Sequence, residues 1–126
     1  MKRTVLMIED NEQNRYLATF LLEQRGHQVV SSADGPSGIE EAGRLLPDII
    51  LLDIQLPGLD GYAVARALRR NPALRDTPIV AVTSYAMPGD REKALEAGCT
   101  AYIEKPIDPD TFVDSIEHFL QPKESP

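Results

Sequence analysis

The stretch LLDIQLPGLDG, Leu51–Gly61, decides the fold, because the apolar run Ile49–Leu52 ends abruptly on the charged residue Asp53. A short, continuous apolar run is typical of a strand that is covered on both faces of its sheet. A carboxylate buried at the end of such a strand is costly unless a cation or hydrogen-bond donors lie nearby. The sequence therefore predicts a buried strand whose final aspartate has charged partners elsewhere in the chain, or else only caps the following turn.

Further short apolar segments resemble this run, and helical patterns separate them. The other predicted strands are Val5–Ile8, a weaker one at Val29–Val30, Ile79–Val82 and Ala101–Ile103. The first predicted helix is Asn14–Arg25, with Leu17, Phe20 and Leu21 on one stripe and Gly26 after its end. The second is Pro36–Leu46, and the third is capped by Asp60 and runs through Val64, Ala67 and Leu68 before Asn71. The fourth is Pro88–Gly98, and the last starts at Asp108 and Pro109 and carries Phe112, Val113, Ile116 and Leu120.

Strict alternation of strands and helices predicts an α/β fold with a parallel sheet and helices on both of its faces. In a doubly wound sheet of this kind, ligands bind beyond the carboxyl ends of the strands. The residues that follow the strands are therefore the candidates for a functional site.

Composition limits the possible functions. The 126 residues suit one domain, and 20 acidic against 13 basic residues give a net charge of -7. This charge repels nucleic acid and anionic membranes, so we expect neither as a direct partner. Neither a signal peptide nor a membrane-spanning stretch is apparent, which predicts a cytoplasmic protein.

The single cysteine and the two histidines do not suggest a site. Cys99 has no possible intramolecular disulfide partner and is predicted to be a small core residue. His27 and His118 have no second ligand at metal-binding spacing, and both are predicted to lie on the surface.

Acidic, hydroxyl and basic side chains follow the predicted strands. Because carboxylates that lie close together repel one another, a cluster of them takes up protons or a cation, and an all-oxygen set suits Mg²⁺ better than zinc. A lysine and a hydroxyl beside the metal would complete a cradle for a phosphoryl group, with Asp53 as its nucleophile. The residues concerned are Glu9, Asp10, Asp53, Thr83, Ser84 and Lys105.

Each of these residues also has an ordinary interpretation when taken alone. Glu9 and Asp10 could simply open the next loop, since acidic residues are common at helix starts. Thr83 is a usual strand residue and Lys105 a usual surface residue. Only their common position at one edge of the sheet favours the phosphoryl site.

Four stretches resemble, in order and spacing, the receiver domain of two-component response regulators. The resemblance covers nearly the whole chain and looks closest to stand-alone regulators of the DivK type and to receivers of hybrid kinases. It implies a CheY-like, flavodoxin-like fold with five parallel strands in the order 2-1-3-4-5 and five helices, in a domain that we expect to span residues 1–121, with 122–126 as a short tail. The stretches are MIEDNEQNR (Met7–Arg15), PDIILLDIQLPGLDGY (Pro47–Tyr62), PIVAVTSYAMPGD (Pro78–Asp90) and AGCTAYIEKPI (Ala97–Ile107).

The resemblance implies a role for each matching residue. Asp53 would be the phosphoacceptor and Lys105 the lysine that offsets its charge. Mg²⁺ would be served by Asp10, Glu9, Asp53 and the backbone carbonyl of Gln55. Glu9 stands where many relatives have aspartate, so a water could separate it from the metal.

Further matching residues concern switching and phosphate lifetime. Thr83 would be the switch hydroxyl and Tyr102 the switch aromatic, although Tyr102 could also be a plain core residue. The bond between Lys105 and Pro106 is usually cis in this family. Gln55 and Tyr85 flank the expected phosphate site and would set how readily water reaches the acyl phosphate.

The implied function is transfer of a phosphoryl group to Asp53 from a histidine kinase or histidine phosphotransfer protein. Phosphorylation would then change the surface of the fourth helix, fifth strand and fifth helix for a protein partner. Because the chain ends soon after its fifth helix, we expect a stand-alone regulator, either a monomer or a phosphorylation-dependent dimer. It would supply groups for its own phosphorylation and dephosphorylation rather than act as an enzyme.

Other classes remain open at this stage. The chain could be the N-terminal receiver of a longer regulator. A magnesium-dependent phosphohydrolase of the haloacid dehalogenase class would need a second aspartate where Gln55 stands, and a flavodoxin-like carrier would need a hydroxyl- and glycine-rich loop where the chain reads EDNEQN, Glu9–Asn14.

Overall fold

The computed structural model describes residues 2–56, 58, 60–84 and 87–120. Five parallel strands form one sheet in the order β2-β1-β3-β4-β5, which confirms the predicted fold. Tyr85 and the predicted tail 122–126 lie outside the described residues. The strands are β1 (Thr4–Ile8), β2 (Gln28–Ser32), β3 (Ile49–Asp53), β4 (Ile79–Thr83) and β5 (Ala101–Glu104).

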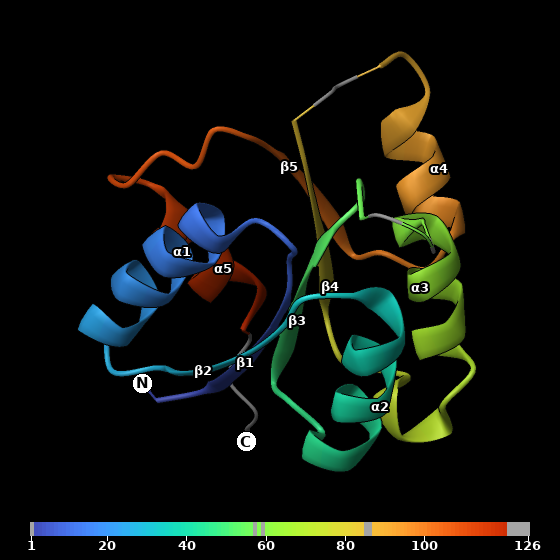
Figure 1. Cartoon of the computed structure of the whole chain (residues 1–126), viewed down its shortest axis with the longest axis horizontal. Helices are drawn as coiled ribbons and strands as arrows, with labels where there is room; N and C mark the ends of the chain where they lie inside the picture. Colours follow the sequence, from blue (N-terminus) through green and yellow to red (C-terminus); the bar gives the residue numbers. More distant parts are fainter. Residues whose placement is uncertain (1, 57, 59, 85–86, 121–126) are drawn as a thin grey trace.

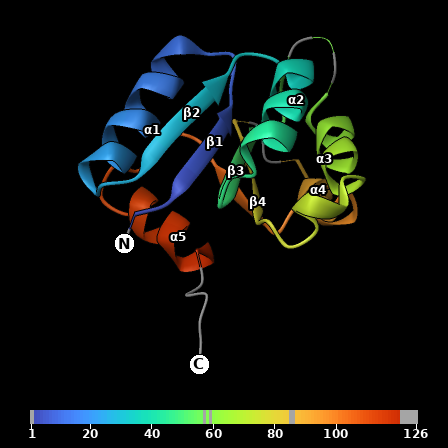
Figure 2. The same cartoon turned by 90° about the horizontal axis from the view of Figure 1, so that it is seen from below.

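Helices cover both faces of the sheet. Figures 1 and 2 show α1 and α5 on one face and α2, α3 and α4 on the other. None of the helices in the described ranges combines the length and the apolar character that crossing a membrane requires. The helices are α1 (Glu12–Gln24), α2 (Gly35–Leu45), α3 (Gly61–Arg69), α4 (Asp90–Glu96) and α5 (Phe112–Phe119), with a 3-10 turn at Pro72–Leu74 that the sequence did not predict.

The core lies in two layers that β1, β3 and β4 separate. Every residue of β3 is buried, because its side chains alternate between the two helical layers. Ile50 and Leu52 pack with α2, α3 and α4, whereas Ile49 and Leu51 pack with α1 and α5. Cys99 is buried in the layer that contains α2, α3 and α4, as predicted. Burial raises the pKa of its thiol to about 11.

Side-chain caps fix the starts of three helices. The carboxylate of Asp60 accepts a hydrogen bond from the Ala63 amide at 2.9 Å, and that of Asp34 accepts one from the Ser37 amide at 2.8 Å. Asn11 caps α1 in the same way through the Asn14 amide. Each cap satisfies a backbone N–H that has no partner within its helix.

The buried face of α1 and the starts of four helices differ from the prediction. The helix α1 begins at Glu12 rather than Asn14, and α2 begins at Gly35 rather than Pro36. Ala18 and Leu22 are the buried residues of α1, while Phe20 is 48% exposed and stacks on the exposed Tyr16. The helix α4 begins at Asp90, after Gly89 in a left-handed conformation, rather than at Pro88. The helix α5 begins at Phe112, because the side chain of Asp108 accepts from the Asp110 amide in a preceding turn.

His27 is buried, with 3% of its surface exposed, so its predicted surface position is wrong. Its Nδ1 lies 3.2 Å from the Arg3 amide, which donates to it, and its Nε2 lies 2.8 Å from a carboxylate oxygen of Glu117. Since Nδ1 accepts, the ring proton is assigned to Nε2 and is donated to Glu117. Glu117 also pairs with Arg25, so His27 helps to hold α5 against α1. His118 is exposed, as predicted.

Arg69, on the last turn of α3, binds four backbone carbonyls, three of them in partly buried contacts and the fourth, that of Arg75, in a longer exposed one at 3.3 Å. Its Nε donates to the Gly98 carbonyl at 2.8 Å, and its Nη1 donates to those of Leu74 and Thr77, each at 2.7 Å. Gly98 has a φ of +109°, and a Cβ there would come within 2.5 Å of the Arg69 side chain. The Arg69 guanidinium thus links two connecting segments to α3: the one between α3 and β4, and the one between α4 and β5.

We expect Arg69→Met to lower the free energy of unfolding by about 2–4 kcal/mol, because three partly buried carbonyls lose a charged donor. Urea unfolding measures the change. Arg70→Met, on the exposed neighbour, is the matched control and should stay within about 0.5 kcal/mol of the parent. Equal effects of the two substitutions would contradict the role of the carbonyl contacts.

Candidate functional site

The carboxyl ends of four strands deliver the predicted site residues to one edge of the sheet. Asp53 is the last residue of β3 and Thr83 the last of β4. Glu9 follows β1 directly, and Lys105 follows β5 directly. The parallel pairing places Asp53 beside Val82 and Thr83 beside Glu104, so residues far apart in sequence meet here.

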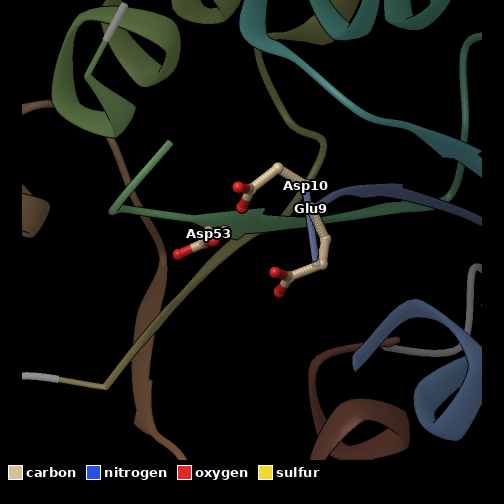
Figure 3. A group of neighbouring side chains, drawn as sticks. All are labelled: Glu9, Asp10 and Asp53. Carbon is tan, nitrogen blue, oxygen red and sulfur yellow. The ribbon is translucent and has the colours of Figure 1, made fainter. Parts of the chain in front are cut away.

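Three carboxylates form a cluster at this edge. Figure 3 shows Glu9, Asp10 and Asp53 together at the strand ends, and one oxygen from each lies within 4.8 Å of the others. Glu9 and Asp53 are buried, while Asp10 is exposed to solvent. A hard divalent cation such as Mg²⁺ fits this donor set, because all its ligand atoms are oxygens and Asp10 leaves room for water ligands.

Lys105 lies between two of the carboxylates. Its Nζ is 3.0 Å from Oε1 of Glu9 and 3.7 Å from Oδ2 of Asp53, and its side chain is only 10% exposed. The Lys105 amide donates to the Thr83 carbonyl, and the peptide bond to Pro106 is cis, as the resemblance implied. Lys105, which directly follows β5, therefore places a positive charge next to the buried carboxylate of Asp53.

Both oxygens of Glu9 already have partners. Oε1 contacts Lys105, and Oε2 accepts from the Asn11 amide at 3.2 Å. The guanidinium of Arg15 donates to the Glu9 carbonyl at 2.8 Å. Sequence reasoning missed Asn11 and Arg15, although the position of Asn11 before a helical pattern is a capping signal that could have identified it.

Burial raises the pKa of Asp53 to about 6. The Gln55 amide, which donates to Oδ1 at 2.9 Å, acts in the opposite direction, as does the charge of Lys105. Glu9 raises the pKa further, because a second negative charge nearby disfavours ionisation. The aspartate is thus held at a position where its charged form needs additional positive charge.

Gln55 makes two contacts across the edge of the site. Its backbone amide binds Asp53, and its side-chain oxygen accepts from the Ser84 amide at 3.0 Å. The second bond links the segment after β3 to the segment after β4. The resemblance implied roles for the backbone carbonyl of Gln55 and for its position beside the expected phosphate site, but this bond was not predicted.

Gly61 allows α3 to begin directly against the end of β3. Its amide donates to the Ile54 carbonyl at 3.0 Å. A Cβ at this position would lie 2.4 Å from the Ile54 backbone and 2.9 Å from the Asp53 carbonyl. Any larger residue would displace the segment that carries Asp53.

Thr83 and Tyr102, the predicted switch pair, lie on the adjacent strands β4 and β5. Thr83 is 2% exposed. Tyr102 is half-buried and packs on the layer beneath α4, and its hydroxyl is buried without a hydrogen-bond partner among the described residues. Burial and the charge of Asp90 raise the pKa of Tyr102. Asp90 receives a long hydrogen bond from Tyr62 instead, at 3.4 Å.

Comparisons with known proteins agree with this geometry. The family model of the response regulator receiver domain matches residues 5–117. The polar-differentiation response regulator DivK of Brucella anthropi is 39% identical over 95% of this chain and 98% of its own length.

Solved structures show the same similarity. The receiver domain of a sensor histidine kinase from Pseudomonas aeruginosa, described with a magnesium ion coordinated in its active-site cleft, is 34% identical with a TM-score of 0.87, over 95% of this chain and 98% of that one. A CheY chemotaxis protein of Vibrio cholerae has a TM-score of 0.89 at 24% identity, over 94% and 99% of the two chains, which supports the fold alone.

We expect Asp53→Asn to stabilise the protein at pH 7 without divalent cations, by about 1–3 kcal/mol, because it removes a buried charge and keeps an acceptor for the Gln55 amide. A raised folded-state pKa means that the native protein holds the Asp53 proton more tightly than the unfolded chain. The protonated Asp53 side chain therefore stabilises the folded state below about pH 4, and this contribution is lost as the pH rises through about 6.

The gain from Asp53→Asn should therefore appear between about pH 4 and 6 in urea unfolding and should shrink when Mg²⁺ is added. Asp76→Asn, on an exposed aspartate, is the control. An Asp53→Asn gain that does not change with pH would contradict a buried charge at this position.

Proposed function

The chain belongs to the response regulator receiver family, and we propose that Asp53 is its phosphoacceptor in a two-component phosphorelay. Receiver domains are signalling proteins that interact with histidine kinases and downstream partners. The observation that carries the proposal is the place of the Lys105 ammonium between Glu9 and Asp53, beside a cluster of three carboxylates. No other acidic cluster of this kind occurs in the part of the chain that the structure describes.

The proposed metal site uses the residues of this cluster. Asp10, Asp53 and the backbone carbonyl of Gln55 would hold Mg²⁺, and Glu9 would act through a water. Glu9 has this indirect role because Lys105 and the Asn11 amide already occupy its oxygens. When bound, the metal ion supplies positive charge to the phosphoryl oxygens.

In the proposed transfer, a carboxylate oxygen of Asp53 attacks the phosphorus of a phosphohistidine. The phosphorus–nitrogen bond breaks, the imidazole keeps the electron pair and takes a proton, and an acyl phosphate forms on Asp53. Lys105 offsets the charge that develops on the transferred group. Hydrolysis by water later returns Asp53 and inorganic phosphate, at a rate that Gln55 and Tyr85 would set through access of that water.

Signalling would use the surface of α4, β5 and α5. Thr83 would move onto the phosphoryl group, and Tyr102 would reorient with it, which changes this surface for a protein partner. The buried and unsatisfied hydroxyl of Tyr102 supports two arrangements of this side chain.

We propose that the receiver spans residues 1–121 and works as a stand-alone cytoplasmic regulator, as a monomer or as a phosphorylation-dependent dimer. The match to DivK over 98% of the length of that protein supports this arrangement. The alternative is the N-terminal receiver of a longer regulator. The length of the open reading frame distinguishes the two.

Incubation with a small phosphoryl donor and Mg²⁺ should add one phosphoryl group, detected by intact mass. Asp53→Asn and removal of the metal should each abolish the adduct, because both remove groups that the transfer requires. Asp60→Asn, which keeps an N-cap acceptor for α3, is the matched control and should be modified normally. An adduct on Asp53→Asn would locate the phosphoacceptor elsewhere.

Thr83→Ala should leave phosphorylation of Asp53 largely intact and uncouple the switching surface, because the variant lacks the hydroxyl that would move onto the phosphoryl group. The measurement is the change in amide NMR shifts of α4, β5 and α5 upon addition of beryllofluoride, and we expect most of it to disappear. Thr19→Ala, on α1, is the control. Full shifts in Thr83→Ala would remove Thr83 from the switching mechanism.

A further inference from the structure

A single side chain connects the segment that carries Asp53 with the end of β4. The backbone amide of Gln55 donates to Oδ1 of Asp53 at 2.9 Å. The side-chain oxygen of Gln55 accepts from the backbone amide of Ser84 at 3.0 Å. We call the second contact the cross-loop bond. It links the segment that follows the candidate phosphoacceptor Asp53 to Ser84, the first residue after Thr83.

The Ser84 amide is placed where an anion could use it. The ladder between β3 and β4 ends at the pair Asp53 and Val82, and Ser84 lies beyond it at the carboxyl edge of the sheet. Backbone N–H groups at such an edge stabilise anions, because their dipoles are fixed and need no reorganisation. In this structure the Gln55 side chain occupies that donor.

The cross-loop bond has no evident structural role in the core. Gln55 and Ser84 are both exposed, and their contact adds no apolar burial. The backbone amide of Gln55 already fixes the carboxylate of Asp53, so the side chain is not required for that purpose. The bond is therefore free to break without cost to packing.

We propose that Gln55 is a positioning residue whose side chain holds the Ser84 amide in the unphosphorylated state and gives it up to a phosphoryl oxygen on Asp53. This inference rests on the proposed function. A charged phosphoryl oxygen is a stronger acceptor than a neutral amide oxygen, so it displaces the side chain when both compete for one N–H. Release of the cross-loop bond then separates the segments after β3 and β4, next to Thr83.

The test uses Gln55→Met, which keeps the length of the side chain but has no amide oxygen. Gln13→Met, on an exposed glutamine of α1, is the matched control. The first readout is hydrogen exchange of the Ser84 amide in the free protein, which reports the cross-loop bond itself. The second is the affinity for beryllofluoride in the presence of Mg²⁺, followed by amide NMR shifts.

In Gln55→Met we expect faster hydrogen exchange at the Ser84 amide. We also expect about threefold to tenfold tighter binding of beryllofluoride, because it no longer competes with the Gln55 side chain for that amide. Unchanged exchange would show that the bond is absent and would overturn the inference. Faster exchange with unchanged affinity would also overturn it, even if the acyl phosphate lifetime changed, because control of water access alone alters hydrolysis and not binding. A parent protein that binds no beryllofluoride would instead overturn the proposed function, and the inference with it.

Discussion

The structure depends on one costly interaction, the burial of the Asp53 carboxylate at the end of the central strand. Burial alone raises the pKa of this group, and the neighbouring Glu9 raises it further. Lys105 and the Gln55 amide offset part of this cost. The remaining deficit of positive charge explains why the edge of the sheet suits a metal ion: a further cation would offset the cost of the Asp53 carboxylate.

The topology makes this compensation possible. Glu9, Asp53, Thr83 and Lys105 each lie at the end of a different strand, and parallel pairing brings all four ends to the same edge. The helix α3 packs closely against this edge, because the amide of its first residue, Gly61, donates to the Ile54 carbonyl and no space remains there for a Cβ. A sheet with alternating directions would have dispersed these side chains to two edges.

Periodicity and position along the chain were sufficient to predict the strands, their common direction and the site carboxylates. They failed where partners distant in sequence decide the outcome. His27 is buried because Glu117 of α5 accepts a hydrogen bond from its Nε2, and Phe20 is exposed because Ala18 and Leu22 are the α1 residues that pack in the core. Nor did the sequence reveal Arg69 or the side chain of Gln55 as connectors, since each bonds to backbone atoms that carry no residue-specific signal.

The carbonyl contacts of Arg69 also have a mechanical consequence for α4. They hold Gly98, just beyond the end of this helix, while the start of the helix lies beyond the segment that follows Thr83. The helix α4 is therefore held to α3 at both ends, by the Arg69 contact with the Gly98 carbonyl and by the hydrogen bond from the Tyr62 hydroxyl to Asp90. The two attachments are unequal, since the Arg69 contact at Gly98 measures 2.8 Å and the Tyr62 contact at Asp90 measures 3.4 Å, so the carboxyl end of α4 is held more tightly than its first turn.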